Sequence, residues 1–378
     1  MNETTRTAEC TTQPAIFLAF ELGRTKWKLG FSPGLGQDAR IRTVDAGELG
    51  ALRKEIDQAK RRFRLPEEAE VRSCYEAGRD GFWLHRYLTS LGVRNVVVDS
   101  ASIEVNRRAR RTKTDRVDVA KLLTMLIRYH SGEESVWSVV HVPSVEAEDM
   151  RHVQRQLHSL QRARTQHLNR IGGLLASQGV EVPVRAGFLD SLASVRLWDG
   201  SVLPPRLCAR VRREYSSLKS VEQEIRELEA ERDEVIETSN EASVIQVRQL
   251  MRLKGIGPAS AWLFVMEFFA WREFRNRRQV GGLAGLTPTI YQSGDESHEQ
   301  GISKAGNRLV RAMAIEIAWG WLQHQPDSEL TLWYYKVFGE GGKRRHKVGI
   351  VALARKLLVA LWHYLERGEI PAGAVLKA

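Results

Sequence analysis

The sequence has few cysteines and no long apolar segment. Its three cysteines, Cys10, Cys74 and Cys208, have neither the spacing of a metal site nor an even number for pairing. This argues against a disulfide framework and for a reducing compartment. There is no run of 18 apolar residues, and the N-terminus lacks the pattern of a signal peptide. We therefore expect a soluble, cytoplasmic protein that does not enter a membrane.

Acidic residues are outnumbered by basic ones. The 57 Lys and Arg residues against 46 Asp and Glu give a net charge of +11 at pH 7 and a pI of about 9.7. Such an excess favours a polyanionic partner, of which nucleic acid is the usual one and a membrane surface the second. With 378 residues, 43% of them hydrophobic, the chain is long enough for two or three domains.

The first hundred residues alternate between short apolar runs and amphipathic segments. We expect strands at 15–23, 26–31, 69–75 and 95–98, and helices at 46–63 and 79–91. The first two strands should pair as an antiparallel hairpin. Strands that alternate with helices in this way indicate an α/β sheet.

Acidic residues stand where the buried strands are expected to end. Glu21, Glu76 and Asp99 all occupy such positions. A carboxylate at the end of a buried strand is costly unless a metal or another cation compensates it.

A second pair of acids opens a helix further along the chain. Thr114 is a plausible N-cap, and Asp115 and Asp118 project from one face of the first turn. Either aspartate alone would merely complement the helix dipole. That explanation does not account for the acids at strand ends. If Glu21 and Glu76 converge with both aspartates, the four form a site for a hard divalent ion, Mg²⁺ or Mn²⁺.

A basic segment lies between the expected sheet and this helix. It contains Arg107, Arg108, Arg110, Arg111 and Lys113, five cations in seven residues. Such a run is usually a solvated surface. Next to a group of carboxylates, a loop that follows a nucleic-acid backbone is at least as plausible.

The middle of the chain predicts two long, polar helices. Residues 146–178 carry an apolar stripe at helical spacing, and residues 218–235 carry another, with Glu222 placed to meet Arg226. Residues 180–205 interrupt the pattern with three prolines. The two helices form either an antiparallel hairpin or an intermolecular coiled coil. A simple spacer and a dimerisation device are equally compatible with the sequence.

Two glycine-containing segments follow. Residues 253–261 resemble a helix-hairpin-helix turn, in which Gly255 and Gly257 allow a tight bend and backbone amides can hold a phosphate. Residues 285–308 predict a long irregular loop that carries Ser293 and His298. The end of the loop and the following helix add polar and basic side chains suited to a phosphate: Lys304, Asn307, Arg308 and Arg311.

These residues resemble the IS110 family of insertion-sequence transposases, which includes the Piv-like DNA invertases, over nearly the whole chain. One part of the resemblance is the ordered set of acids with its Lys-Thr-Asp-x-x-Asp string, and another is the turn at 251–258. The most specific part begins with Gly-Leu-Thr-Pro at 285–288, continues with Ser293-Gly294, and ends with Gly-Ile-Ser-Lys-x-Gly-Asn at 301–307 and Arg311.

The resemblance implies three domains. Residues 1–140 would form a RuvC-like domain of RNase H fold, whose catalytic acids Glu21, Glu76, Asp115 and Asp118 bind Mg²⁺ or Mn²⁺. Residues 141–243 would form a coiled-coil segment. Residues 244–378 would form a mainly helical transposase domain that supplies Ser293 as the nucleophile for a covalent phosphoserine intermediate.

The resemblance also implies the partners. These are the element's DNA ends and target DNA, a noncoding bridge RNA that pairs with them in at least some members, and further copies of the chain in a homodimer or homotetramer. The protein would act in the bacterial cytoplasm.

One residue departs from the family. The family usually begins its acidic tetrad with aspartate, whereas this chain has Glu21. The longer side chain shifts a carboxylate whose geometry matters for magnesium. Glu21 is the best evidence for one alternative, a nucleic-acid-binding relative without catalysis. A second alternative, which does not rest on Glu21, is a RuvC-type nuclease that uses metal-activated water in place of Ser293.

Overall fold

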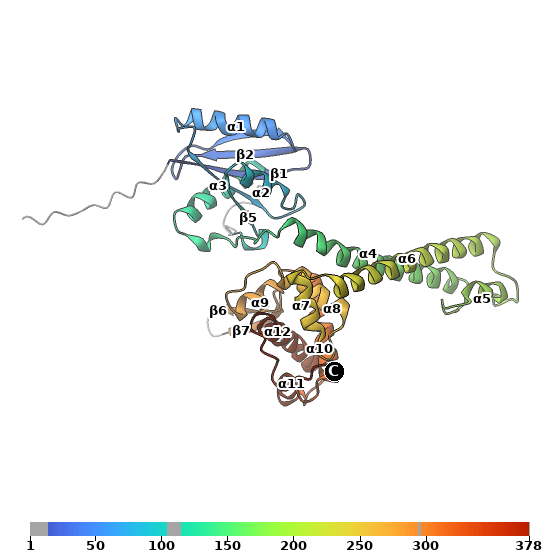
Figure 1. Ribbon diagram of the computed structural model, residues 1–378. Coiled ribbons are helices and arrows are strands. Elements are labelled where there is room, and N and C mark those ends of the chain that lie inside the picture. Colours follow the sequence, from blue (N-terminus) through green and yellow to red (C-terminus); the bar gives the residue numbers. More distant parts are fainter. Residues whose placement is uncertain (1–13, 104–114, 294–295, 378) are drawn as a thin grey trace, which may run out of the picture. The chain divides into compact units, whose positions relative to one another are not determined.

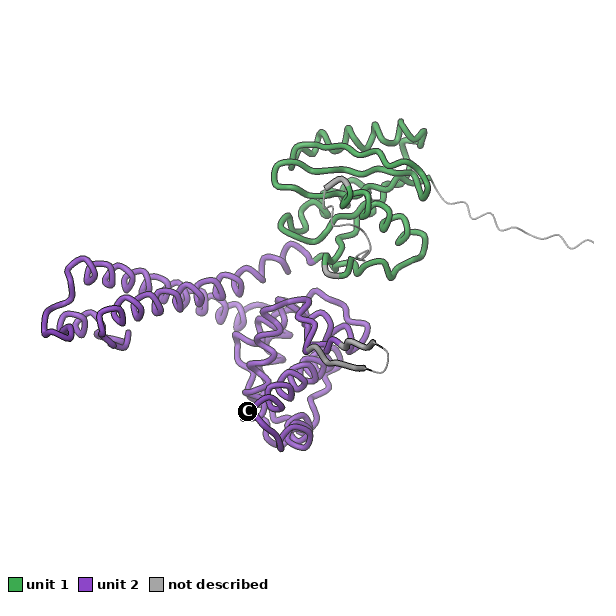
Figure 2. The backbone as a smooth tube through the Cα atoms, turned by 180° about the vertical axis from the view of Figure 1, so that it is seen from behind, with its two compact units in different colours: residues 1–142 green, residues 143–378 purple. Residues whose placement is uncertain are grey.

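The computed structural model describes residues 14–103, 115–293 and 296–377, with the backbone alone at residues 101, 115–116, 290–293 and 296–300. The chain divides into two compact units, Met1–Val142 and Pro143–Ala378 (Figure 2). Each unit is described by itself below.

The first unit is built on a five-stranded mixed sheet of order β3-β2-β1-β4-β5. β1 pairs with β2 in antiparallel fashion and with β4 in parallel, and β5 continues the parallel part. The strands are β1 (Ala15–Leu22), β2 (Lys26–Ser32), β3 (Arg40–Asp45), β4 (Glu70–Glu76) and β5 (Arg94–Val98). The helices are α1 (Leu49–Arg62), α2 (Trp83–Ser90) and α3 (Asp115–His130), with 3₁₀ turns η1 (Ser100–Ser102) and η2 (Glu134–Val136).

Helices cover both faces of this sheet (Figure 1). On one face, α1 and α2 pack against Leu18, Phe20 and Tyr75. On the other, α3 packs against Phe17, Ala19 and Cys74 of β1 and β4. The alternation of side chains along β1 and β4 thus divides their residues between two apolar cores, as expected for a sheet buried on both sides. The predicted α/β layout of the N-terminal region is confirmed.

The second unit begins with two long helices that lie side by side as an antiparallel hairpin (Figure 1). α4 (Val145–Ala176) and α6 (Pro205–Thr238) are joined through the short α5 (Phe188–Ser194). Buried apolar side chains of both helices pack together, and side-chain contacts show the antiparallel pairing, such as Arg164 Nε to Glu222 Oε1 at 3.2 Å and His167 Nδ1 to Glu214 Oε2 at 2.7 Å. Glu222 thus pairs with Arg164 and with Lys219 at 2.9 Å. The prediction that it meets Arg226 was wrong, because Arg164 and Lys219 take the carboxylate and Arg226 Nη2 donates to Gln223 Oε1 instead.

The rest of the second unit is mainly helical, as predicted. Its core is formed by apolar side chains of α7, α8, η3, α9, α10, α11 and α12, with Trp262, Phe264, Trp321 and Leu361 fully buried. The bounds are α7 (Ala242–Met251), α8 (Pro258–Phe264), the π-helix η3 (Val265–Phe269), α9 (Arg277–Leu283), α10 (Arg308–His324), α11 (Glu329–Phe338) and α12 (Lys343–Arg367).

The segment expected to be an irregular loop contains a β-hairpin. β6 (Pro288–Ser293) and β7 (Glu296–Ile302) pair in antiparallel fashion, with an irregularity between Pro288 and Ile290. The expectation gave too much weight to the glycines and to Pro288. Thr289, Ile290 and Tyr291 are β-branched or aromatic and favour a strand, and proline is tolerated as the first residue of one.

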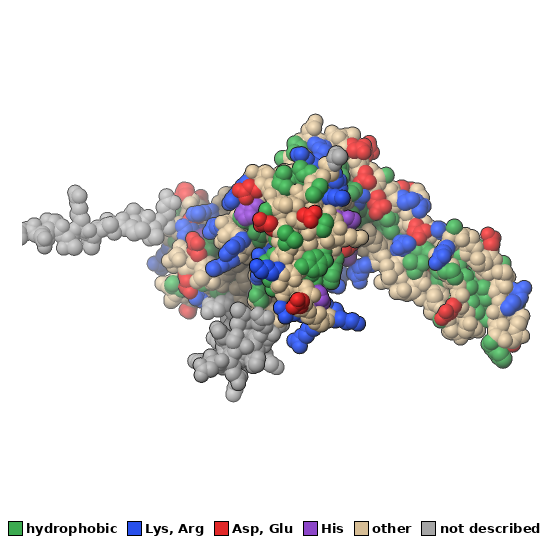
Figure 3. Space-filling model, turned by 90° about the horizontal axis from the view of Figure 1, so that it is seen from below, with side chains coloured by type: hydrophobic (Ala, Val, Ile, Leu, Met, Phe, Trp, Pro, Cys, Tyr) green, Lys and Arg blue, Asp and Glu red, His purple; other side chains and the backbone are tan. Residues whose placement is uncertain are grey.

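α12 is the one helix, among the described residues, that is long and apolar enough to cross a membrane by composition. Half of its most apolar window is buried inside the unit, as is usual for a core helix. On the face of the molecule in Figure 3, Lys and Arg side chains are interspersed with acidic and hydrophobic ones. The positive net charge is therefore not gathered into one patch on this face.

Candidate functional site

Two of the predicted acids lie at the same edge of the first unit's sheet. Glu21 is the penultimate residue of β1, and Glu76 ends β4. β1 and β4 are parallel with Phe20 opposite Tyr75, so that Glu21 and Glu76 follow at neighbouring positions. By strand alternation both belong to the face that Ala19 and Cys74 share with α3. Glu21 is half-buried and Glu76 exposed.

The first turn of α3 lies toward the same edge. A Cβ atom on Gly30, which pairs with Ala19, would be 3.2 Å from a methyl group of Val119. At the other end of the helix, the rings of His130 and Phe17 lie 5.9 Å apart. α3 therefore runs opposite to β1, and its N-terminal residues approach the level of Glu21. The half-buried Asp118 is on this turn.

The metal site itself stays a prediction. Among the described side chains, no group of three or more His, Cys, Asp or Glu could hold a metal ion. Asp115, the fourth predicted ligand, lies outside the described side chains. Glu21, Glu76 and Asp118 are all described, and the structure does not bring the three into one such group. Carboxylates are the ligands that Mg²⁺ and Mn²⁺ prefer. Asp99 directly follows β5 at this edge, and its backbone amide donates to Ser138 O at 2.9 Å.

The basic segment predicted to follow a nucleic-acid backbone lies outside the described residues. It comprises Arg107, Arg108, Arg110, Arg111 and Lys113.

In the second unit, Ser293 is the last residue of β6 and is paired with Glu296 of β7. The base of this hairpin is held by two interlocked loops. Gly285 and Gly306 have φ of +69° and +84°, and a Cβ on either would overlap the backbone of the opposite loop, at Ala305 O and Leu283 O. Only glycine permits so close an approach of two backbones.

The four polar and basic residues after the hairpin have two kinds of environment. Lys304 and Arg308 are exposed, so that both can reach a phosphate. Arg311 instead donates from Nη1 to Ala284 O at 3.3 Å and Ala305 O at 3.4 Å, which ties the two loops together. The Asn307 side chain caps α10, because its Oδ1 accepts from the amides of residues 309 and 310. The contacts of all four residues with nucleic acid stay predictions. In addition, Asn307 caps α10 and Arg311 joins the two loops.

The turn predicted around Gly255, of the helix-hairpin-helix type, lies between helices α7 and α8. Gly255 has φ of +93°, and Gly257 precedes Pro258 as the N-cap of α8. The Lys254 amide donates to Val375 O at 3.1 Å, and the Gly257 amide donates to Ser260 Oγ at 3.1 Å. A phosphate held by these two amides would therefore have to replace an internal hydrogen bond.

A buried carboxylate that the sequence interpretation missed lies in the second unit. Glu267, on η3, is 0% exposed. It accepts from Arg155 Nε at 2.8 Å and Nη2 at 3.3 Å, and Arg151 Nε lies 3.5 Å from it. Asn307 Nδ2 donates to its Oε2 at 3.1 Å, and Arg272 Nη1 to its backbone oxygen at 2.8 Å. We call these five residues the Glu267 cluster.

A signal for this cluster was present in the sequence. Glu267 is the one charged residue in the apolar run 261–271. A charge in so apolar a run is buried and must find partners. Those partners, however, lie on α4, more than a hundred residues away, and no local pattern points to them.

Burial and charge act in opposite directions in this cluster. Burial raises the pKa of Glu267, but the hydrogen bond from Arg155, the charges of Arg155 and Arg151 and the bond from Asn307 outweigh it, so that the pKa lies below its ordinary value. Burial and the charge of Arg151 lower the pKa of Arg272 to about 9, against the attraction of Glu267. Two guanidinium groups, those of Arg155 and Arg151, thus face one ionised carboxylate, and Arg272 binds the backbone oxygen of the same residue.

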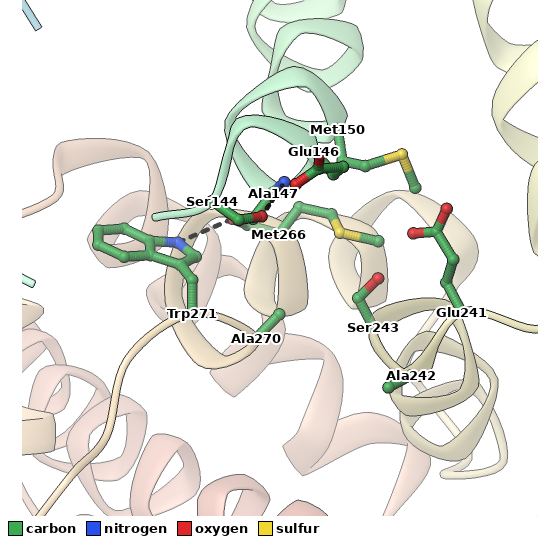
Figure 4. Close-up of a pocket in the computed structure, with 10 residues that line it drawn as sticks. All are labelled: Ser144, Glu146, Ala147, Met150, Glu241, Ala242, Ser243, Met266, Ala270 and Trp271. Carbon is green, nitrogen blue, oxygen red and sulfur yellow. Dashed lines mark hydrogen bonds between the residues drawn. The ribbon is translucent and has the colours of Figure 1, made fainter. Parts of the chain in front are cut away.

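A cavity of about 270 Å³ lies beside the cluster (Figure 4). It is lined by Met150, Met266 and Trp271, whose Nε1 donates to Met266 O at 3.0 Å, and by the carboxylates of Glu146 and Glu241. The guanidinium carbons of Arg151 and Arg272 lie 4.8 and 3.8 Å from the centre of the Trp271 ring. A lining of methionines and carboxylates does not favour a phosphate.

Comparison with known proteins identifies the class. Residues 247–332, which include Glu267, Ser293 and Asn307, match the sequence profile of the transposase family described as IS116/IS110/IS902. A Sinorhizobium fredii protein provisionally named as the transposase y4rJ is 41% identical over 376 residues, 96% of this chain and 95% of that protein.

More distant relatives agree. The transposase for insertion sequence element IS1111A of Coxiella burnetii is 24% identical over 75% of this chain and 75% of that protein. The transposase for insertion sequence element IS1328 of Yersinia enterocolitica is 26% identical over 56% of this chain and 61% of that protein. These are insertion-sequence transposases, enzymes that cut and rejoin DNA. The chain belongs to the IS116/IS110/IS902 family.

Proposed function

We propose that this transposase cuts and rejoins DNA through Ser293 as the nucleophile, assisted by a divalent metal ion that the acids hold. The observation that carries the proposal is the position of Ser293. It lies inside the family-matched region, at the end of a strand whose base is fixed by two interlocked loops. The proposed metal ligands are Glu21, Glu76, Asp115 and Asp118, and the ion is Mg²⁺ or Mn²⁺.

A serine hydroxyl is a weak nucleophile unless a base or a metal activates it. A bound divalent ion polarises a phosphate and lowers the pKa of a coordinated hydroxyl. The chain's own residues supply the rest. The acids fix the site, and the exposed Lys304 and Arg308 hold phosphate oxygens and stabilise charge. The serine oxygen bonds to phosphorus as one DNA oxygen leaves with a proton, and attack by a DNA hydroxyl later reseals the strand and frees the serine.

The further partners belong to the same proposal. The mixed sheet of the first unit is compatible with a RuvC-like, RNase H fold. The exposed cations suit contacts with the phosphate backbone, which carry no sequence information. Choice of DNA sequence is therefore assigned to a noncoding bridge RNA that pairs with donor and target. The active form is a homodimer or homotetramer in the bacterial cytoplasm.

A second candidate is supported by Glu21. The longer side chain in place of the family's usual aspartate favours a relative with slow or lost catalysis. A separate alternative, which does not rest on Glu21, is a RuvC-type nuclease that hydrolyses DNA with metal-activated water. Such a nuclease would cut DNA without any protein–DNA bond. A catalytically inactive relative would bind nucleic acid and cut nothing.

The test is incubation of the protein with the element's DNA ends, its RNA and Mg²⁺, followed by a denaturing gel. We expect a covalent protein–DNA adduct with the wild type and none with Ser293→Ala. Ser303→Ala is the matched control, because Ser303 is exposed and lies at the base of the same hairpin; it should form the adduct. Cleavage without an adduct would support the nuclease instead.

A further inference from the structure

We infer that Glu267 is a positioning residue that ties helix α4 to the base of the β6–β7 hairpin and so holds Ser293 in place. The inference rests on the proposed role of Ser293. It adds a residue that lies far from Ser293 in sequence and acts through others.

The first step is the anchoring of Glu267 to α4. Its carboxylate is 1% exposed and receives two hydrogen bonds from Arg155, with Arg151 as a second cation. The Arg151 side chain is itself 9% exposed. Buried hydrogen-bonded ion pairs are sensitive to loss of one partner, since the remaining charge is left uncompensated. The position of the carboxylate is therefore set by α4.

The second step is the link from Glu267 to α10. Asn307 uses both ends of its amide: Oδ1 caps the first turn of α10, accepting from Leu309 N at 2.9 Å and Val310 N at 3.2 Å, and Nδ2 donates to Glu267 Oε2 at 3.1 Å. The carboxylate thus determines where the amide of Asn307 lies, and with it the start of α10.

The third step leads from Asn307 to the hairpin. Three backbone amides donate across the two loops: that of Asn307 to the backbone oxygen of residue 283 at 3.1 Å, that of Lys304 to Gly285 O at 3.2 Å, and that of Ser303 to Thr287 O at 2.8 Å. β6 begins directly after Thr287, and β7 ends directly before Ser303. A displacement of Asn307 is therefore passed through a backbone ladder to both strands of the hairpin.

The hydrogen bond between Glu267 and Asn307 is tested by exchanging the carboxylate of one residue with the side-chain amide of the other. Asn307→Asp retains the N-cap, since Asp and Asn cap helices equally well, but it brings a carboxylate against that of Glu267. Glu267→Gln leaves the arginines without their anion. The combined Glu267→Gln/Asn307→Asp variant places an amide at 267 and a carboxylate at 307, which restores one hydrogen bond between them and one negative charge among the arginines.

A matched control is available on α9. Asn276 caps that helix in the same way, with Oδ1 accepting from Arg278 N at 2.9 Å and Gln279 N at 3.1 Å, and it is not part of the Glu267 cluster. Asn276→Asp makes the same chemical change at the same kind of position. It should leave every measured rate at the wild-type value.

Two readouts are needed. The first is the rate of adduct formation at saturating DNA, with DNA affinity measured separately. We expect each single variant to lower the rate on the order of tenfold to a hundredfold, as a misplaced reacting group does. DNA affinity should be unchanged in Glu267→Gln, and the combined variant should recover most of the rate. A combined variant no faster than the single ones, or single variants as fast as the wild type, would overturn the inference.

The second readout does not depend on activity. Hydrogen exchange of the amides of Ser303, Lys304 and Asn307 should be faster in Asn307→Asp and return toward wild type in the combined variant. Unchanged exchange at these amides overturns the inference, whatever the activity. If the wild type forms no adduct, the proposed function fails, while the exchange rates still decide whether Glu267 positions the hairpin base.

Discussion

At the scale of single residues, the carboxylates of Glu21 and Glu76 are at neighbouring positions of two parallel strands. If they hold a metal, Glu76→Gln should weaken Mn²⁺ binding by about tenfold or more. Even the loss of a residue that only hydrogen-bonds to a metal ligand weakens binding by that order. Titration of the apoprotein followed by electron paramagnetic resonance measures this without reference to activity. Glu48→Gln, an exposed acid in the same unit, is the control. Equal affinities in all three proteins would contradict the site.

Glu267 provides a prediction on stability and pH. Glu267→Gln should lower the free energy of unfolding at pH 7 by about 3 kcal/mol, because it leaves the buried Arg151 without its anion. The pKa of Glu267 is lowered in the folded protein from the ordinary 4.5. Its contribution is therefore complete above about pH 4.5 and is lost as the pH falls through the folded pKa.

The difference between the wild type and Glu267→Gln should accordingly shrink below about pH 4.5. Denaturant unfolding at a series of pH values measures it. A difference that stays constant down to acid pH would mean that the charge of Glu267 contributes nothing to stability.

The residues differ in how far the sequence could predict them. Glu21 and Glu76 were placed at strand ends because a buried strand is visible in a local apolar run, and the structure confirms those positions. The role of Glu267 was not predicted, and Asn307 was predicted to contact a phosphate but not to join Glu267 to α10. Their role in the structure depends on Arg151 and Arg155, which contact Glu267 only because α4 packs on η3.

At the scale of elements, the interlocked loops at the hairpin base provide a sharp test. Gly285→Ala and Gly306→Ala should each destabilise the protein by more than about 1 kcal/mol, because alanine is strained at positive φ and its Cβ overlaps the opposite backbone. Gly282→Ala, inside α9 with open space around it, should be neutral or stabilising by up to about 1 kcal/mol.

Thermal unfolding of the three variants measures this. Equal changes in stability for alanine at positions 282, 285 and 306 would show that the close approach of the two loops does not contribute to the stability of the protein. The loops join the strands of the hairpin to α9 and α10, so that the first two variants should also slow adduct formation.

Elements were predictable where the pattern was local. The helices and most strands of the first unit follow from apolar periodicity, and α4 and α6 from their long stripes. The short strand β3 (Arg40–Asp45) was missed because half of its residues are exposed and it is held by pairing with β2. The β6–β7 hairpin was missed for a related reason: pairing between its two strands outweighs the local effect of glycine and proline.

At the scale of the whole molecule, the two parts of the proposed centre lie in different units: the acids in the first and Ser293 in the second. The long helix α4 returns through α6 as an antiparallel hairpin, and Arg155 near its start already contacts Glu267 of η3. Its length is therefore not a spacer between the two parts, as the sequence had suggested. We propose that the acids of one subunit and Ser293 of another complete one site.

Mixing two inactive variants tests this composite site. Ser293→Ala lacks the nucleophile and Asp115→Asn a metal ligand, so neither should form the adduct alone. A mixed oligomer contains one intact site made from both chains, and some activity should return. Mixtures that stay inactive after subunit exchange has been demonstrated would indicate that each site is built within one chain.

The most direct test of the account is the identity of the residue that becomes attached to DNA. After the reaction with Mg²⁺, nuclease digestion leaves a nucleotide remnant on the protein, and tryptic fragmentation with mass spectrometry locates it within the peptide 279–304. The account predicts the remnant on Ser293. A remnant on another residue of that peptide, such as Tyr291 or Ser297, or DNA cleavage with no remnant on any peptide, would contradict it.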